Sequence, residues 1–225
     1  MTIRRLTRAV GRARRNVLGK ALARWRGIWR AVLERRLAGR GIRSVNLACG
    51  TQRVPGYFGI DLVDGADLRL DLSKMDLPFA AGSLDVVVCM SAINYFPRAR
   101  AVQLAREMRR VLRPGGVCRV GVQDMQALAR RYLERDLEFY FQKLPDGRDR
   151  FEGPTLGDKF AAWFYGYAVG ANRCEYFYDY ESLAHLFREA GFSVVERRNY
   201  RDSRIAEVEQ LDNRPDQMFF LEAVA

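Results

Sequence analysis

Histidine is almost absent from this chain, and cysteine is sparse. His185 is the single histidine among 225 residues, and it lies within a predicted helix. The four cysteines are far apart and form no Cys-x-x-Cys pair: Cys49, Cys89, Cys118 and Cys174. Because zinc sites are built mainly from closely spaced cysteine and histidine ligands, the sequence predicts no metal site. We expect small buried thiols in a reducing compartment.

Long apolar runs are also missing. No segment approaches the roughly 18 uninterrupted apolar residues that a membrane-spanning helix needs, so we expect a cytoplasmic protein without a transmembrane span. With 225 residues and 48% hydrophobic content, the chain is long enough for one domain with a full core.

Acidic residues are missing from one end only. Residues 1–43 contain 14 arginines or lysines and a single acid, Glu34, whereas the rest of the chain holds 24 basic and 26 acidic side chains. The formal net charge of +11 therefore belongs to an N-terminal arm, and the remainder is nearly neutral.

The basic arm, residues 1–43, predicts an amphipathic helix over residues 3–38. Apolar side chains recur at helical spacing between arginines: Leu18, Leu22, Trp25, Trp29, Val32 and Leu33. Four interpretations are open. The helix packs on the flank of the domain, lies on the anionic inner face of a membrane, grips nucleic-acid phosphates, or serves as an organelle transit peptide, which the scarcity of hydroxyl residues disfavours.

Residues 44–61 have the outline of an adenosine site. A short apolar run, Val45-Asn46-Leu47, breaks into the small residues Ala48-Cys49-Gly50, and a second short run ends at the acid Asp61. A strand that ends in a small-residue loop brings backbone N–H groups close to a ligand, and an acid at the tip of the neighbouring strand can hold a ribose diol.

Strands and helices then alternate along the chain. Residues 66–72 and 86–90 predict further strands, residues 99–112 a helix ending at Arg113-Pro114-Gly115-Gly116, and residues 117–122 a fifth strand. This order indicates an α/β fold with a doubly wound, Rossmann-like and mostly parallel sheet of seven strands. The last two strands, residues 192–200 and 217–224, are expected to pair antiparallel, after a helix over residues 180–190 that Asp179 caps and Gly191 ends.

Residues 126–178 depart from this alternation and are rich in aromatic side chains. They predict a helical insertion after the fifth strand, with its own small core. Insertions at strand tips sit over the ligand site of such sheets, so part of this segment is expected to act as a lid.

Six motifs in register resemble the class I S-adenosylmethionine-dependent methyltransferases. They are Asn46-Leu47-Ala48-Cys49-Gly50, Gly59-Ile60-Asp61, Asp71-Leu72, Leu77-Pro78-Phe79, Ser83-Leu84-Asp85-Val86-Val87 and Val111-Leu112-Arg113-Pro114-Gly115-Gly116. The chain is also similar to the bacterial methyltransferases associated with surface-polysaccharide biosynthesis, through the ending that includes Leu211-Asp212-Asn213-Arg214-Pro215. The resemblance covers residues 44–224, so we take residues 44–225 as the methyltransferase domain.

The resemblance implies S-adenosylmethionine as cofactor, no metal, and a role for each matching residue. The turn Ala48-Cys49-Gly50 would hold the methionine end, Asp61 both ribose hydroxyls, and Asp71 with the backbone of Leu72 the adenine edge. Asn46 and Ser91 complete the expected cofactor-binding set, and Asp85 is expected to fix the start of the fourth strand.

The chain departs from the family pattern at three places. Ala48 replaces the first glycine of the turn, which is a mild change if that residue keeps a negative φ. The common His-x-Leu-Glu-His reads Ser91-Ala92-Ile93-Asn94-Tyr95, which removes two bases and an acid, and Pro-Asp-Leu reads Gln123-Asp124-Met125. Asp124 and Tyr95 are therefore the candidates for a base or acceptor-orienting group. Each has a structural alternative, as a capping carboxylate and as a buried phenol.

Three functions follow as hypotheses. The first is methyl transfer to a hydroxyl of a glycan, glycolipid or other small molecule, with the arm placing the enzyme at the inner membrane face. The second is a non-catalytic cofactor-binding or scaffold protein. The third is a nucleic-acid methyltransferase, which the lack of an Asn/Asp-Pro-Pro-Tyr/Phe motif after the fourth strand disfavours.

Overall fold

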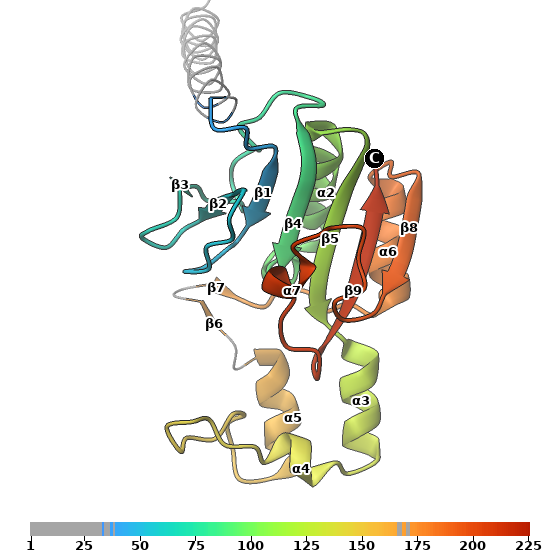
Figure 1. Ribbon diagram of the computed structural model, residues 1–225. Coiled ribbons are helices and arrows are strands. Elements are labelled where there is room, and N and C mark those ends of the chain that lie inside the picture. The colour runs from blue at the N-terminus through green and yellow to red at the C-terminus, as the bar shows by residue number, and fades with distance from the viewer. Residues whose placement is uncertain (1–32, 34–36, 38, 166–167, 170–171) are drawn as a thin grey trace, which may run out of the picture.

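The computed structural model describes residues 33, 37, 39–165, 168–169 and 172–225. The helix predicted over residues 3–38 lies almost wholly outside this part of the chain. A seven-stranded sheet forms the centre of the protein, with the strand order β3-β2-β1-β4-β5-β9-β8 (Figure 1). Its strands are β1 (Ser44–Leu47), β2 (Tyr57–Asp61), β3 (Leu68–Arg69), β4 (Leu84–Met90), β5 (Leu112–Gln123), β8 (Val194–Arg198) and β9 (Met218–Val224).

The pairing of the strands confirms the predicted fold class. Strands β3, β2, β1, β4 and β5 run parallel to their neighbours. Strand β9 is antiparallel to both β5 and β8, which gives the predicted antiparallel ending. The central strands β1 and β4 read as short apolar runs because both faces of the sheet are covered there.

One face of the sheet is covered by α2 (Arg98–Val111) and α6 (Tyr180–Glu189). The buried apolar side of α2 packs into the main core with β1, β4 and β5. Helix α6 begins at a capping box between Asp179 and Ser182, and the chain leaves it at Gly191, whose φ is +98°. Both ends were predicted from these residue types.

The opposite face is covered by the connection between β8 and β9, residues 199–217, which includes the short helix α7 (Val208–Leu211). Its apolar residues Ile205 and Leu211 form a second buried cluster with Val54, Tyr57 and Val88 of the sheet side. The sequence predicted only a polar loop here. The loop lies over the sheet because its few apolar residues bury against β2 and β4.

The third strand is shorter than predicted. Residues 66–72 show an alternating pattern, yet only Leu68 and Arg69 are paired with β2. The flanking acids are engaged through their side chains: Asp67 accepts from the N–H of Gly59 on β2 at 2.7 Å, and Asp71 accepts from the N–H of Ser73 at 2.9 Å. The contact of Asp71 with Ser73 is local and competes with strand pairing after β3.

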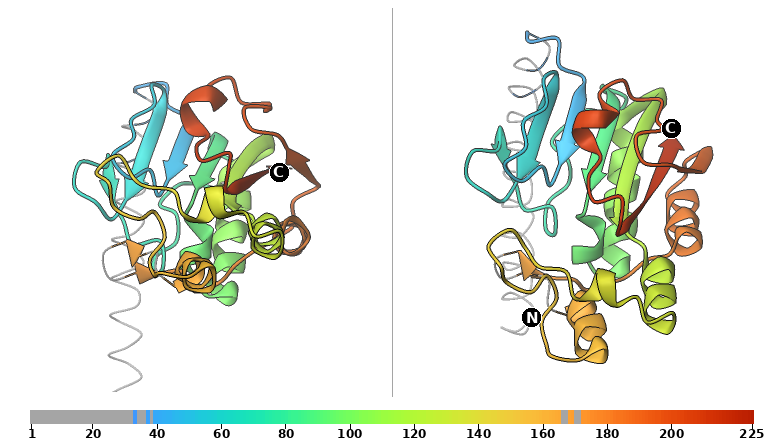
Figure 2. Two further views of the ribbon diagram at one scale, coloured as in Figure 1. Left: turned by 90° about the horizontal axis from the view of Figure 1, so that it is seen from below. Right: turned by 60° about the horizontal axis from the view of Figure 1, so that its bottom comes forward.

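Residues 125–178 form a separate helical layer below the carboxyl ends of β4 and β5 (Figures 1 and 2). It contains α3 (Met125–Leu133), α4 (Leu137–Tyr140), α5 (Leu156–Tyr165) and a small hairpin of β6 (Ala168–Val169) and β7 (Asn172–Arg173). Its aromatic-rich core is its own: Leu128, Phe139, Tyr140, Phe151 and Trp163 are buried together. The predicted helical insertion with a small core is therefore present.

Candidate active site

The tips of β1 and β2 lie side by side at the carboxyl edge of the sheet. Leu47 pairs with Ile60 in parallel register, and the N–H of Cys49 donates to the carbonyl of Ile60 at 3.2 Å. One residue further on each strand, the N–H of Gly50 donates to Oδ2 of Asp61 at 2.7 Å. The small-residue turn and the acid, which lie eleven positions apart in the sequence, are thus in direct contact, as predicted.

The carboxylate of Asp61 is held in one orientation. Its Oδ1 accepts from the N–H groups of Leu62 at 2.6 Å and Val63 at 3.2 Å, while Gly50 holds Oδ2. A carboxylate offers about four acceptor positions, so these three bonds fix its direction and leave capacity for a further donor. The side chain remains partly exposed, as a ligand contact requires.

Two residues at the strand tips have strained backbones. Ala48 follows β1 with φ +52°, and Ser91 follows the neighbouring strand β4 with φ +53°. The condition under which alanine at position 48 would be a mild change, a negative φ, is therefore not met. A side chain in the left-handed region costs roughly 1–2 kcal/mol, and such strain clusters at functional sites because the turn geometry is needed there. Tertiary contacts, such as that of Gly50 with Asp61, hold Ala48 in this conformation.

Asn46 and Cys49 line the same turn from inside. Asn46 is buried in β1, and its amide Nδ2 donates to Oε1 of Gln52 at 3.4 Å. Cys49 is also buried, which raises the pKa of its thiol and keeps it protonated. A Cβ added at Gly59 on β2 would come within 2.8 Å of the sulfur of Cys49, so this position has room only for glycine.

Asp71 and Leu72 lie beyond β3 and are bound to their own surroundings. Asp71 forms an ion pair with Lys74 at 2.8 Å and accepts from Ser73, and the hydrogen bond from Lys74 is the main cause of its lowered pKa. The carbonyl of Leu72 accepts from Arg100 of α2 at 2.7 and 2.9 Å. These contacts fix the loop. Neither contact tests the predicted adenine recognition.

The tips of β4 and β5 form the second half of the edge. The N–H of Ser91 donates to the carbonyl of Gly121 at 2.9 Å, and its hydroxyl lies 3.4 Å from the sulfur of Met218. The 3-10 turn η1 (Ile93–Tyr95) follows, and its Asn94 donates to the sulfur of Cys174 at 2.9 Å. Tyr95 also hydrogen-bonds the Cys174 thiol through its side chain. The uncharged residues after β4 therefore contact Cys174, which lies near the end of the insertion.

Asp124 acts as a helix-capping carboxylate, which was the structural alternative to a catalytic role. Its Oδ1 caps α3 by accepting from the N–H of Ala127 at 3.0 Å, and its Oδ2 pairs with Arg197 of β8 at 3.1 Å. The residue is buried, at 6% exposure. Both oxygens are thus engaged in the structure, and a catalytic role for Asp124 or Tyr95 stays a prediction.

Sequence reasoning missed three polar groups at this edge. Asn94 Oδ1, Gln123 Oε1 and the Tyr178 hydroxyl are buried without a hydrogen-bond partner among the described residues. Gln123 ends β5, and Tyr178 forms a parallel bridge with Asp124, so both lie where the insertion leaves and rejoins the sheet. The sequence signal for Asn94 and Gln123 was only their position near Ser91 and Asp124, and Tyr178 had none.

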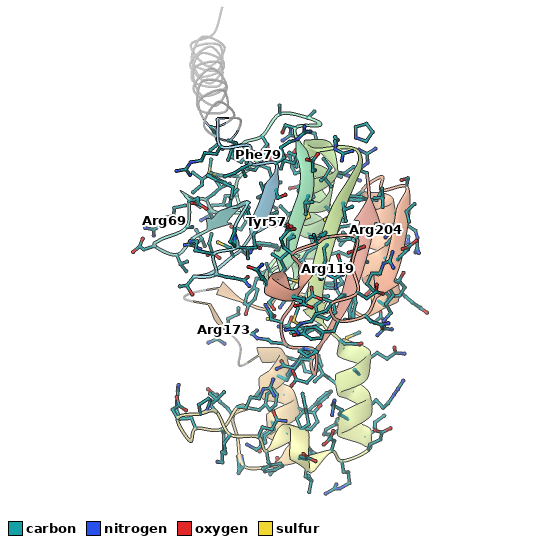
Figure 3. All side chains as sticks on the ribbon, in the orientation of Figure 1. Tyr57, Arg69, Phe79, Arg119, Arg173 and Arg204 are labelled. Atoms are coloured by element: carbon teal, nitrogen blue, oxygen red, sulfur yellow. The ribbon has the colours of Figure 1, made fainter. Side chains whose placement is uncertain are left out.

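The ending Leu211-Asp212-Asn213-Arg214-Pro215 has a structural explanation. Asp212 makes a two-pronged ion pair with Arg119 of β5 at 2.6 and 2.7 Å, and Arg119 also contacts Glu222 at 3.0 Å. All three side chains are fully buried. Figure 3 shows Arg119 in the middle of the sheet, between Tyr57 on one side and Arg204 on the other. This network fixes the 199–217 connection on the sheet. Asp85 is likewise structural, since it pairs with Arg43 and Arg113 at the start of β4.

Comparison with known proteins shows likenesses to methyltransferases. Residues 45–120 match the family model of the methyltransferase domain. A demethylmenaquinone methyltransferase of Lactococcus lactis subsp. lactis is 28% identical over 210 residues, which cover 80% of this chain and 77% of that protein. The chain is an S-adenosylmethionine-dependent methyltransferase. A second demethylmenaquinone methyltransferase, from Bacillus velezensis, is 30% identical over 159 residues. The aligned residues cover 68% of this chain and 59% of that relative.

Solved structures show more distant likenesses to the enzyme. An S-adenosylmethionine-dependent methyltransferase from Mesorhizobium loti is 19% identical, with a TM-score of 0.45 over 82% of this chain and 91% of the other. A second, from Archaeoglobus fulgidus, is 13% identical, with a TM-score of 0.47 over 87% and 94% of the two chains.

The residues at the tips of β1 and β2 fit the cofactor. Gly50 has φ +56°, and a Cβ added there would meet no atom within 4 Å, so the backbone borders open space. Asp61 stands next to it with acceptor capacity to spare. Within the part of the chain that the structure describes, no group of three metal-ligating side chains occurs, and no helix is long and apolar enough to cross a bilayer.

Proposed function

We propose that the enzyme methylates a hydroxylated aromatic ring of the quinol class. The two relatives at 28% and 30% identity carry names for this kind of acceptor. The structural support is the set of uncharged, buried polar atoms at the β4 and β5 tips, namely Asn94 Oδ1, Gln123 Oε1 and the Tyr178 hydroxyl.

These three atoms suit the hydroxyls of an aromatic ring. A buried polar group without a partner costs about 1–3 kcal/mol, so a native protein keeps one mainly where a ligand or water satisfies it. Two of the atoms are amide oxygens that accept from ring hydroxyls. Burial raises the pKa of Tyr178, so its phenol stays protonated and can donate to a ring oxygen. The rings of Tyr176 and Tyr178, 4.9 Å apart, add an apolar surface of the matching kind.

The cofactor would lie against the tips of β1 and β2, with its ribose at Asp61 and its methionine end at Ala48, Cys49 and Gly50. When bound, S-adenosylmethionine supplies an activated methyl carbon whose bond to sulfur breaks as the bond to the acceptor forms. The chain's contribution is positioning, because an in-line displacement depends on the alignment of the two reactants.

The residues on the acceptor side increase the electron density of the aromatic ring. Asn94 and Gln123, accepting from the hydroxyls, raise the electron density of the ring carbon that takes the methyl group, and this carbon then loses its proton to water. Asp124 does not remove this proton, since its two oxygens are already bound to Arg197 and to the first turn of α3. Its role is to fix the position of α3 at the end of β5.

The test is transfer of labelled methyl groups by the full chain to a 1,4-naphthoquinol bearing a short isoprenyl chain. We expect turnover that increases the quinol mass by one methylene unit. A glycan-rich envelope extract and total RNA serve as parallel acceptors for the hydroxyl and nucleic-acid hypotheses from the sequence. Label in either of these, with none in the quinol, would overturn the proposal.

Amide variants examine the acceptor contacts. Asn94→Leu and Gln123→Leu each remove one buried acceptor, and we expect KM for the quinol to rise about tenfold with unchanged affinity for S-adenosylhomocysteine. Gln126→Leu is the matched control, because Gln126 is exposed on α3. Equal KM values in all three variants would remove Asn94 and Gln123 from the acceptor site.

The basic arm, residues 1–43, fits an acceptor that resides in a membrane. Its arginines and tryptophans suit an anionic bilayer surface. We expect the full chain, but not a chain starting at Arg43, to float with vesicles containing anionic lipid. Flotation of both chains, or of neither, would contradict this role.

A further inference from the structure

We propose that Arg150 is a positioning residue that holds the insertion, residues 125–178, against the carboxyl edge of the sheet. It does so through a clasp with Asp216 and Gln217, which immediately precede β9. This inference concerns the placement of the insertion and does not depend on which acceptor the enzyme uses.

The insertion is attached to the sheet by a narrow base. It leaves at Asp124 and returns at Tyr178, and these two residues form a parallel bridge. The N–H of Met125 donates to the carbonyl of Tyr178 at 3.1 Å, which closes the base. Because the insertion also has a separate aromatic core, it is built as a unit that can change its angle to the sheet around this base.

Arg150 lies near the middle of the insertion in the sequence and is fixed from the insertion side. Its guanidinium is 5.6 Å from the ring of Phe139 and 5.5 Å from that of Phe151, and it hydrogen-bonds the side chain of Gln142. Only 17% of the side chain is exposed. The aromatic core therefore presents the guanidinium at a defined place.

The same guanidinium reaches the sheet domain. Its Nη1 pairs with Asp216 Oδ2 at 2.9 Å, and its Nε is 3.3 Å from Gln217 when the amide oxygen of Gln217 faces it. This orientation satisfies both side chains, because it places an acceptor opposite two N–H donors. Gln217 is buried, at 4% exposure.

The docking point borders the methyl-transfer edge. The carbonyl of Gln217 accepts from the N–H of Asp124 at 2.8 Å, and the next residue, Met218, pairs with Gln123 and contacts Ser91. A clasp at Asp216 and Gln217 thus fixes the middle of the insertion one residue from the β4 and β5 tips. At the return of the insertion, the N–H groups of Glu175 and Tyr176 donate to the carbonyl of Asn94, so the insertion contacts this edge at two separate places.

The chain offers a matched control two residues away. Arg148 is on the same segment but 77% exposed, and it pairs with Asp146 inside the insertion. Arg148→Gln removes the same charge as Arg150→Gln without touching the sheet domain. The two variants therefore separate the clasp from a general effect of charge.

The experiment is hydrogen exchange of the full chain with S-adenosylhomocysteine present. In Arg150→Gln we expect amides of residues 137–160 to exchange about tenfold faster, with those of β1, β4 and β5 unchanged. KM for the naphthoquinol should rise severalfold while the Kd of S-adenosylhomocysteine stays the same. Arg148→Gln should match the unmodified chain in every readout.

A charge exchange completes the test. Asp216→Arg alone should reproduce the faster exchange, and Asp216→Arg combined with Arg150→Asp should restore part of the protection. The proposal is overturned if Arg150→Gln and Arg148→Gln exchange alike, if the strands lose protection together with the insertion, or if the double variant restores nothing. The exchange readout decides the clasp even when the naphthoquinol is not methylated.

Discussion

The two halves of the carboxyl edge are held by different kinds of contact. At the β1 and β2 tips, neighbouring backbone N–H groups fix one carboxylate, and all partners lie within residues 48–63. At the β4 and β5 tips, the contacts join distant segments, such as Asn94 with Cys174 and Asp124 with Arg197. The first half is compact and carries the charged Asp61, and we propose it as the binding site of the cofactor. The second contains the ion pair of Asp124 with Arg197 and is assembled from the insertion and from the connection between β8 and β9, which are the parts that can vary to suit an acceptor.

The largest effect should come from removing the charge of the cofactor half. Asp61→Ala eliminates the acceptor of three backbone N–H groups and of the ribose hydroxyls, and hydrogen bonds to a charged group contribute about 1.5–3 kcal/mol each. We expect calorimetry to show that the Kd of S-adenosylhomocysteine rises at least about 100-fold.

Asp64→Ala is the control for this change. Asp64 lies three residues away, its side chain is 95% exposed, and its ion pair is with Arg69. Its loss should leave cofactor affinity unaltered. If Asp64→Ala weakens binding as much as Asp61→Ala does, general charge rather than Asp61 itself controls affinity.

A steric change should act on the same half more weakly. Gly59→Ala places a methyl group 2.8 Å from the sulfur of Cys49, which must displace the turn. We expect about tenfold weaker binding of S-adenosylhomocysteine. Combining it with Cys49→Ala removes the clash and should restore most of the affinity. A double variant as weak as Gly59→Ala alone would show that the contact with Cys49 is not the cause.

The smallest effect concerns the strain at Ala48. Ala48→Gly relieves a left-handed backbone and should raise the free energy of unfolding by about 1 kcal/mol, measured by urea denaturation, with cofactor affinity nearly constant. Ala105→Gly, in the interior of α2, should instead destabilise the enzyme by about 1 kcal/mol or more. A loss of stability in Ala48→Gly would mean that the alanine side chain makes contacts that outweigh the strain.

The cofactor half could be predicted because its determinants are local. A strand ending in Ala48-Cys49-Gly50 and a second ending in Asp61 must meet if the strands are parallel neighbours, and the register of Leu47 with Ile60 bears this out. The backbone of Ala48 could not be predicted, because only tertiary contacts select a left-handed conformation for a residue with a Cβ. The shortened third strand was missed for a similar reason, since the alternating pattern of residues 66–72 does not show that Asp71 hydrogen-bonds Ser73 beyond β3.

The acceptor half was hidden because its contacts span the chain. The sequence placed Asp124 and Tyr95 near the site, but nothing local shows that Asp124 is paired with a residue 73 positions away or that Asn94 meets Cys174 across 80 positions. The buried pair of Arg119 and Asp212, 93 positions apart, likewise gave no sequence signal beyond a familiar ending. Such pairs depend on the order of strands in the sheet, which places β9 between β5 and β8.

A crystal structure of the enzyme with S-adenosylhomocysteine would show whether the paired tips of β1 and β2 hold the cofactor. We expect both ribose hydroxyls within hydrogen-bond distance of Asp61 and the amino-acid end against Ala48, Cys49 and Gly50. Density for the ligand at any other part of the sheet, with Asp61 still bound only to Gly50, Leu62 and Val63, would contradict this expectation.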